Sequence, residues 1–214
     1  MIKQQNNLNN DKYLITTSLL NSWAYIWNCV EGVKEAETDK ISFDEKLYNK
    51  QKNAYEGFIS ALNRIKTPTN EFMQLGIDFE KDCYDGKTEF SKIIENGQFQ
   101  VVGMKEIEVD GMKFLMYGIL DVLKAGVIYD IKRVIKYSRP KYVNSFQHNF
   151  YFCLYPNVKE FTYLIYDGYK YHKESYYDVE KAQDIIDGAI RDFINYLKER
   201  NLLEIYKEKW KCKK

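Results

Sequence analysis

The stretch from residue 98 to residue 134 constrains the fold more than any other part of the chain. Two glycine-containing turn signals, Asp110-Gly111 and Ala125-Gly126, divide it into three segments of strand length, 98–109, 112–123 and 127–134. Two-residue turns of this kind join antiparallel neighbours in a hairpin. The sequence therefore predicts three consecutive strands that form a meander.

Helical periodicity marks most of the remaining chain. Apolar residues recur every three or four positions after Thr17-Ser18, and Asn70 and Asp178 each stand where they can cap a following helix. A second hairpin is expected around Asp167-Gly168. The predicted helices are 19–27, 44–65, 71–84, 89–95, 142–155 and a long one after 178, and the second hairpin joins 159–166 to 169–177.

This order of elements predicts a single α/β domain over residues 1–214, with a central mixed sheet of about five strands flanked by helices. We expect N-terminal helices in 1–69, the core in 70–177, and a C-terminal helix with a basic tail in 178–214. Residues 1–12 are predicted to be polar and frayed, and 31–42 to be a charged connection.

The composition is that of a soluble globular protein, with 45% apolar and 29% charged residues among 214. No apolar run approaches the roughly 18 residues of a membrane helix, and the N-terminus lacks the apolar stretch of a signal peptide. We therefore expect no membrane contact and a cytoplasmic location. The cysteines stand singly, which predicts reduced thiols rather than metal-binding pairs, at Cys29, Cys83, Cys153 and Cys212.

Two carboxylates and a lysine lie close together in the predicted meander. A two-residue turn at Ala125-Gly126 pairs residue 124 with 127 and sets Asp121 opposite Asp130. Asp130 and Lys132 are two apart on one strand, so they project from the same face. Neighbouring carboxylates repel unless a cation lies between them, and their oxygens suit Mg²⁺ or Mn²⁺. The pattern is typical of metal-dependent phosphodiester hydrolysis, in which the lysine holds a phosphate oxygen.

A run without acidic residues follows this pair. Residues 131–158 contain no Asp or Glu, and the basic side chains crowd its beginning, at Lys132, Arg133, Lys136, Arg139 and Lys141. A positive strip beside a carboxylate cluster is what a polyanion bound over a metal requires. The alternative is a solvated loop with an accidental charge bias. The net charge of +1 does not by itself indicate a nucleic-acid partner.

Four short motifs occur in a fixed order along the chain. They are Gly76-Ile-Asp-Phe-Glu80 on a helix, Gly118-x-x-Asp121 and Asp130-x-Lys132 on strands, and Gln147-x-x-x-Tyr151 at helical i, i+4 spacing. This set resembles the PD-(D/E)XK nuclease superfamily, and within it the RecB-like and phage-exonuclease branch. The motifs cover about residues 70–155, and a looser likeness extends to the helix after Thr17-Ser18. The resemblance implies a restriction-endonuclease-like core.

The resemblance also implies a metal centre. Asp121 and Asp130 would be direct metal ligands, the main-chain carbonyl of Ile131 a further ligand, and Glu80 the helix residue that completes the metal shell. Lys132 would orient or help deprotonate the attacking water and steady the scissile phosphate. Mg²⁺ or Mn²⁺ is the expected cofactor, and one or two ions fit three carboxylates.

Substrate-binding residues follow from the same comparison and from the basic strip. Gln147 and Tyr151 would position the substrate and brace the active-site face, and Arg133 and Lys136 would contact the DNA backbone. Each predicted site residue also has a structural interpretation. The acids would then be strand-end, turn or solvated helix positions, Lys132 a surface residue, and Gln147 and Tyr151 ordinary packing residues.

One departure from the family concerns its iron–sulfur clusters. Some RecB-like nucleases hold a cluster with one early cysteine and three clustered near the C-terminus. Cys29 matches the first of these, but Cys212 stands alone at the end of the chain. No iron–sulfur cluster is therefore expected.

These observations predict a Mg²⁺-dependent deoxyribonuclease, and specifically an exonuclease that processes DNA ends in phage-type recombination or repair. DNA is the expected partner, within a bacterium or a phage-infected host cell, and a homo-oligomer or a recombination partner protein is left open. Two alternatives remain at this point: a sequence- or structure-specific endonuclease of the same fold, and a catalytically inactive nucleic-acid-binding module.

Overall fold

The computed structural model describes residues 11–28 and 43–213. The predictions made for Cys29, for residues 1–10 and for the connection 31–42 lie outside the described residues. In chain order the elements are β1 (Lys12–Ile15), α1 (Thr17–Asn28), α3 (Phe43–Leu62), α4 (Glu71–Tyr84), α5 (Ser91–Ile94), β2 (Gln98–Val109), β3 (Met112–Lys124), β4 (Val127–Arg133), α6 (Arg139–Val143), α7 (Gln147–Leu154), β5 (Glu160–Tyr166), β6 (Tyr171–Tyr176), the 3-10 turn η1 (Val179–Lys181), α8 (Ala182–Glu199) and α9 (Leu203–Lys209).

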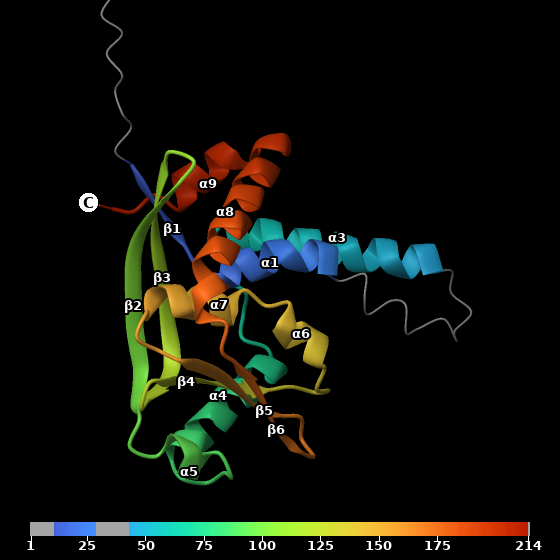
Figure 1. Ribbon diagram of the computed structural model, residues 1–214. Helices are drawn as coiled ribbons and strands as arrows, with labels where there is room; N and C mark the ends of the chain where they lie inside the picture. The colour runs from blue at the N-terminus through green and yellow to red at the C-terminus, as the bar shows by residue number, and fades with distance from the viewer. Residues whose placement is uncertain (1–10, 29–42, 214) are drawn as a thin grey trace, which may run out of the picture.

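The described strands form one mixed sheet in the order β1-β3-β4-β5-β6, and β2 pairs with β3 (Figure 1). The single α/β domain with a mixed sheet is confirmed, but the sheet has six described strands rather than about five. The additional strand, β1, begins at Lys12, where a frayed terminus was predicted, and it pairs in parallel with Lys113–Met116 of β3. Four residues are too short a segment to show a strand pattern clearly.

The predicted hairpins of the meander are confirmed. Val109 pairs with Met112 across the first turn, and Lys124 pairs with Val127 across the second. Ala125 and Gly126 have φ values of 50° and 80°, the left-handed conformation that a type I′ turn requires at both positions. β3 thus pairs with β2 from Met112 to Leu123, except at Asp121, and with β4 from Val122 to Lys124.

The helix predicted over 142–155 is two helices, α6 and α7, with a break at residues 144–146. Asn21 of α1 stabilises the break, because its Nδ2 donates to Ser145 Oγ (3.1 Å) and its Oδ1 accepts from Phe146 N (2.9 Å). Pro140 lies in the first turn of α6, where a missing N–H removes no helical hydrogen bond. As a result Gln147 becomes the first residue of α7.

The chain also departs from prediction at other helix ends. α3 ends at Leu62 rather than near Thr67-Pro68, and Arg64 adopts a φ of 56° just after it. The predicted basic tail contains a helix, α9, which packs beside β1: Leu14 N donates to Trp210 O (2.7 Å), and Tyr206 Oη donates to Leu14 O (2.8 Å). No helix among the described residues combines the length and apolar character needed to cross a membrane.

Two apolar clusters cover opposite faces of β4 and β5. The larger one packs α1, α3, α7 and α8 against Ile128, Phe161 and Tyr163. The smaller one packs Phe79 and Cys83 of α4, together with α5, against Ile131 and Leu164. Because strand residues alternate in direction, Asp130 and Lys132 project from the face of β4 opposite to Ile131. This face is the one that α7 covers.

His148 of α7 is a buried titratable group that belongs to the core. Its ring stacks on Tyr176 with centroids 4.1 Å apart, its Nε2 lies 3.1 Å from Asn149 Nδ2, and its Nδ1 has no hydrogen-bond partner. Burial lowers the pKa of His148 to about 4, so the folded protein holds the ring neutral. We assign it no catalytic role.

This burial predicts acid sensitivity of folding. An unfolded histidine binds a proton below about pH 6.5, whereas the folded one resists until about pH 4, so stability is complete above pH 6.5 and falls below it. Urea unfolding of the wild type should lose about 2 kcal/mol more than His148→Phe between pH 7.5 and 5. The phenylalanine keeps the stacking on Tyr176. Equal losses in the two proteins would contradict a neutral buried His148.

Candidate metal and phosphate site

Asp130 on β4 is the most buried acid of the predicted site, with 3% of its surface exposed. Its Oδ1 accepts a hydrogen bond from Gln147 Nε2 (2.5 Å), and its Oδ2 lies 2.7 Å from Lys132 Nζ. Burial raises the pKa of Asp130 to about 7; the charge of Lys132 opposes this shift and that of Asp121 adds to it. An amide and an ammonium group therefore fix the orientation of this carboxyl group.

Asp121 lies opposite Asp130, as the turn at Ala125-Gly126 predicts. The paired register ends with Val122 and Tyr129, one residue short of the two aspartates. At the next position Asp121 Oδ2 accepts from Ile131 N (2.7 Å), so a side-chain oxygen takes the main-chain donor of the neighbouring strand. The strands β3 and β4 thus carry their acids at the point where their main-chain pairing ends.

Lys132 lies between these charges and is 36% exposed at its side chain. Burial alone would lower the pKa of Lys132, but the charges of Asp130 and Asp121 outweigh it and raise the pKa above its ordinary value. The side chain is consequently a permanent cation near neutral pH. Its positive charge can attract a phosphate oxygen.

Glu80 reaches the same region from the last turns of α4. Its Oε1 accepts from Tyr84 Oη (2.5 Å) and from Gln100 Nε2 (2.7 Å). Burial raises the pKa of Glu80, and the charge of Asp121 raises it further while Lys132 lowers it. The same aspartate therefore acts electrostatically on both Glu80 and Asp130.

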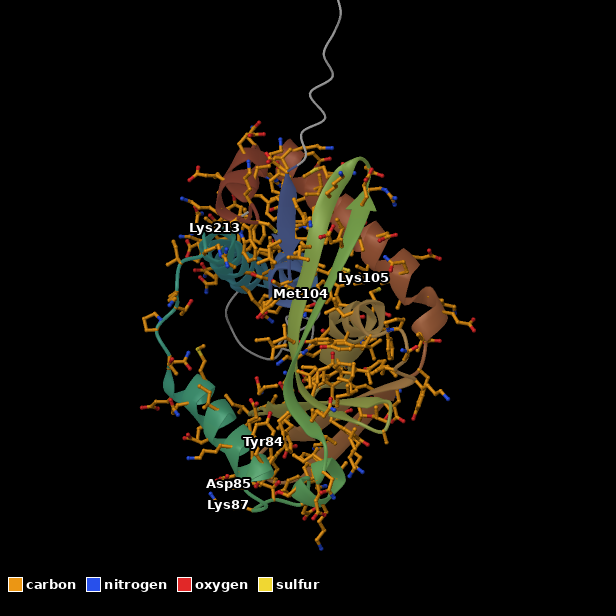
Figure 2. All side chains as sticks on the ribbon, turned by 90° about the vertical axis from the view of Figure 1, so that its left-hand side faces the viewer. Tyr84, Asp85, Lys87, Met104, Lys105 and Lys213 are labelled. Atoms are coloured by element: carbon orange, nitrogen blue, oxygen red, sulfur yellow. The ribbon has the colours of Figure 1, made fainter. Side chains whose placement is uncertain are left out.

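Sequence reasoning did not identify the two partners of Glu80. The spacing of Tyr84 from Glu80, i, i+4 on a helix, could have indicated this contact. Figure 2 shows Tyr84 at the end of α4, beside the lower part of the β2–β3 hairpin. Gln100 had no such signal. Its φ of 52° is a left-handed conformation that an L-residue adopts at a cost of roughly 1–2 kcal/mol, which no composition pattern indicates.

The donor set suits a hard divalent cation, since it consists of carboxylate oxygens. Asp130 Oδ2 is buried and lies 2.7 Å from the Lys132 ammonium group, so an ion bound at this oxygen would share it with Lys132. Within residues 11–28 and 43–213, however, no three Asp, Glu, His or Cys side chains are grouped closely enough to hold a metal as they stand. Instead, Asp121 accepts a hydrogen bond from Ile131 N. Glu80 accepts hydrogen bonds from Tyr84 and Gln100.

Gly118 and Tyr151 explain why two of the motifs occur together. Tyr151 of α7 is 3% exposed, and its Oη donates to Ile119 O (2.5 Å). Its ring lies so close to Gly118 that a Cβ there would be 2.9 Å from Tyr151 Cε1. The i, i+4 spacing thus lets α7 hold Asp130 through Gln147 and brace β3 three residues before Asp121. The contacts of Tyr151 support the bracing role and leave it no exposed surface for substrate.

Arg133 and Lys136, predicted to bind substrate, do not join this cluster. Arg133 lies over the ring of Tyr166, 4.9 Å from its centroid, and donates to the main-chain oxygen of Val134. It therefore stabilises the connection to the β5–β6 hairpin. Lys136 is exposed on the loop after β4. Among the four predicted substrate-binding residues, only Gln147 contacts a predicted metal ligand.

A cavity of about 460 Å³ adjoins the cluster on the side of α1 and α6. Lys132 and Gln147 form part of its wall, so it opens onto the same side chains that hold Asp130. The remaining wall comes from α1, α3, the segment 138–145 and Tyr163 of β5. The site therefore combines acidic groups on the strands with a neighbouring basic cavity.

The close contact at Gly118 predicts a specific sensitivity. Gly118→Ala should lower the free energy of unfolding by about 1–3 kcal/mol, because the methyl group displaces the Tyr151 ring. The control is Gly57→Ala in α3, where nothing lies within 4 Å of the new Cβ and the helix should gain up to about 1 kcal/mol. Chemical denaturation measures both. Equal effects at the two glycines would refute the bracing of β3 by Tyr151.

The sequence matches no known protein family and no curated protein. The crystal structure of SSO0001 is similar in fold, with a TM-score of 0.51 and 12% sequence identity, over 84% of this chain and 76% of that chain. At this identity the likeness concerns the fold alone. It confirms the α/β architecture of a mixed sheet flanked by helices.

Proposed function

We propose that this protein is a metal-dependent nuclease that hydrolyses phosphodiester bonds in DNA. One observation carries the proposal: buried Asp130 is held between Gln147 and Lys132 and lies opposite Asp121, where main-chain pairing of β3 and β4 ends. A buried acid with a raised pKa costs stability, and such groups concentrate at functional sites.

The residues that would hold the ion are Glu80, Asp121 and Asp130, with the main-chain carbonyl of Ile131 as a further ligand. When bound, Mg²⁺ or Mn²⁺ supplies Lewis-acid activation of a water molecule and of the phosphate group. Asp121 Oδ2 accepts from Ile131 N, and Glu80 Oε1 accepts from Tyr84 and Gln100. Each carboxylate would reach the ion through its second oxygen or after a side-chain rotation. Gln147 keeps Asp130 in place throughout.

We assign Lys132 an electrostatic role. Its charge lies where negative charge accumulates as the phosphate is attacked, and a fixed cation stabilises that state without reorganisation. Its partner Asp130 fixes the ammonium group in position, 2.7 Å from Oδ2.

Action on DNA ends, as an exonuclease in phage-type recombination or repair, is the more specific part of the proposal. It rests on the order of the motifs from Glu80 to Tyr151. A sequence- or structure-specific endonuclease would use the same side chains. Circular DNA separates these two activities, because an exonuclease leaves it intact.

A second candidate is a nucleic-acid-binding module that does not cleave. The observation that favours it is the lack of a ready-made metal group among the described side chains. In that case the Asp130–Lys132 pair would be a fixed ion pair, and Asp121 a permanent acceptor for Ile131 N. Metal binding distinguishes the two candidates.

Cleavage assays test the nuclease proposal directly. Linear DNA should be degraded with Mg²⁺ and preserved with EDTA, and Asp130→Asn and Lys132→Ala should each lower the rate at least a hundredfold, as removal of one oxyanion-stabilising group does in other enzymes. The controls are Asp192→Asn and Lys198→Ala, which change exposed residues of α8. Undiminished cleavage by the two site variants would remove the proposed site.

Thermal melting tests the metal centre without any substrate. A ligand that binds only the folded protein raises its melting temperature, by an amount equivalent to about 2.7 kcal/mol at a hundred times the dissociation constant. Mn²⁺ should therefore stabilise the wild type and Asp192→Asn but not Asp130→Asn or Asp121→Asn. An equal rise in all four proteins would place the ion elsewhere and favour the non-cleaving module.

A further inference from the structure

The cavity beside Lys132 has a wall without negative charge. Its described lining includes three lysines, one each from α3, β4 and α6, and no Asp or Glu: Lys50, Lys132 and Lys141. Asparagines, serines, tyrosines and Gln147 complete the polar part of the lining. A concave, positively charged surface of this kind attracts an anion.

Two of these lysines have no carboxylate partner. Neither Lys50 nor Lys141 forms an ion pair with the described residues, and Lys141 Nζ lies 6.0 Å from the centroid of the Tyr142 ring. Burial lowers the pKa of Lys141, and the positive charge of Lys132 lowers it further. The two ammonium groups therefore repel each other. A bound phosphate would relieve their repulsion.

The size of the cavity limits what can occupy it. About 460 Å³ falls within the range of pockets that bind single small molecules, about 300–1,000 Å³. This volume suits one nucleotide with its phosphate. It does not suit a base-paired duplex, whose two backbones and stacked pairs need an open groove.

Tyr25 gives the cavity an aromatic surface. It lies on α1, lines the cavity, and is 51% exposed. No stacking contact joins its ring to another aromatic side chain among the described residues. An exposed ring next to cationic side chains is the arrangement that binds unpaired bases, because every base has a face that can stack.

We propose that this cavity holds one unpaired nucleotide of the strand that is cut, with its base against Tyr25 and its phosphate near Lys50 and Lys141. Single-stranded DNA is then the preferred substrate, and duplex ends must open to enter. The position of Lys132 and Gln147 in the same wall places this nucleotide beside the proposed metal ligands. The cleavage part rests on the proposed function, whereas the binding part does not.

Binding measurements in EDTA test the cavity without hydrolysis. The probes are a fluorescent oligodeoxythymidylate and a duplex of the same length, followed by anisotropy. The single strand should bind at least tenfold more tightly than the duplex. Tyr25→Ala should weaken single-strand binding by roughly five- to a hundredfold, the range of one lost base stack. Lys50→Gln should reduce the slope of log affinity against log salt by about 0.7.

Matched controls come from α3 and the segment after it. Tyr48→Ala removes a ring that is 66% exposed, and Lys66→Gln removes an exposed charge; neither residue lines the cavity. Both should bind like the wild type, and melting curves confirm that all four variants are folded. Wild-type affinity in Tyr25→Ala and an unchanged salt slope in Lys50→Gln would overturn the proposal, as would tighter binding of the duplex.

The two proposals can fail separately. A protein that binds single strands through Tyr25 and Lys50 but cleaves nothing in Mg²⁺ supports the cavity and refutes the nuclease. A protein that needs Asp130 for cleavage, but whose Tyr25→Ala variant keeps the wild-type ratio of single-strand to duplex cleavage, supports the nuclease and refutes the cavity.

Discussion

The contact of buried Asp130 with Gln147 and Lys132 is the constraint on which the proposed site depends. A carboxyl group that is 3% exposed is costly unless hydrogen bonds and an opposite charge compensate. Here one oxygen accepts from an amide on α7, and the other lies 2.7 Å from an ammonium group two residues along the same strand. These contacts link α7 to β4 and orient Lys132, and they oppose the rise in pKa that burial causes at Asp130.

The fold positions this pair through features that act at a distance from it. The type I′ turn fixes the register of β3 and β4, so that Asp121 lies opposite Asp130. Asn21 of α1 stabilises the non-helical segment before α7 through its two hydrogen bonds, so that α7 begins at Gln147. The ring of Tyr151 packs against Gly118, and a side chain at residue 118 would collide with this ring. Helix and strands are thereby locked in one relative position.

Local patterns in the sequence were sufficient to predict the hairpins of the meander and the placement of Asp121 opposite Asp130. They also predicted the helix cap at Asn70, whose side-chain oxygen accepts from Met73 N at 2.9 Å. Features that depend on distant partners were not predictable. β1 finds its main-chain partners in β3 and in the segment after α9, and the break before α7 depends on a residue more than a hundred positions earlier. The direction of Arg133 toward Tyr166, and the bond from Gln100 to Glu80, likewise depend on tertiary packing rather than on spacing.

The most direct test of the central claim is a crystal structure after soaking in Mn²⁺, with the ion located by its anomalous scattering. The account predicts a peak within about 2.0–2.2 Å of carboxylate oxygens of both Asp121 and Asp130, close to Glu80 and with Lys132 Nζ on the open side. Diffraction data that show no ion between the two aspartates at saturating Mn²⁺, or an ion bound only at other acids, would contradict the account.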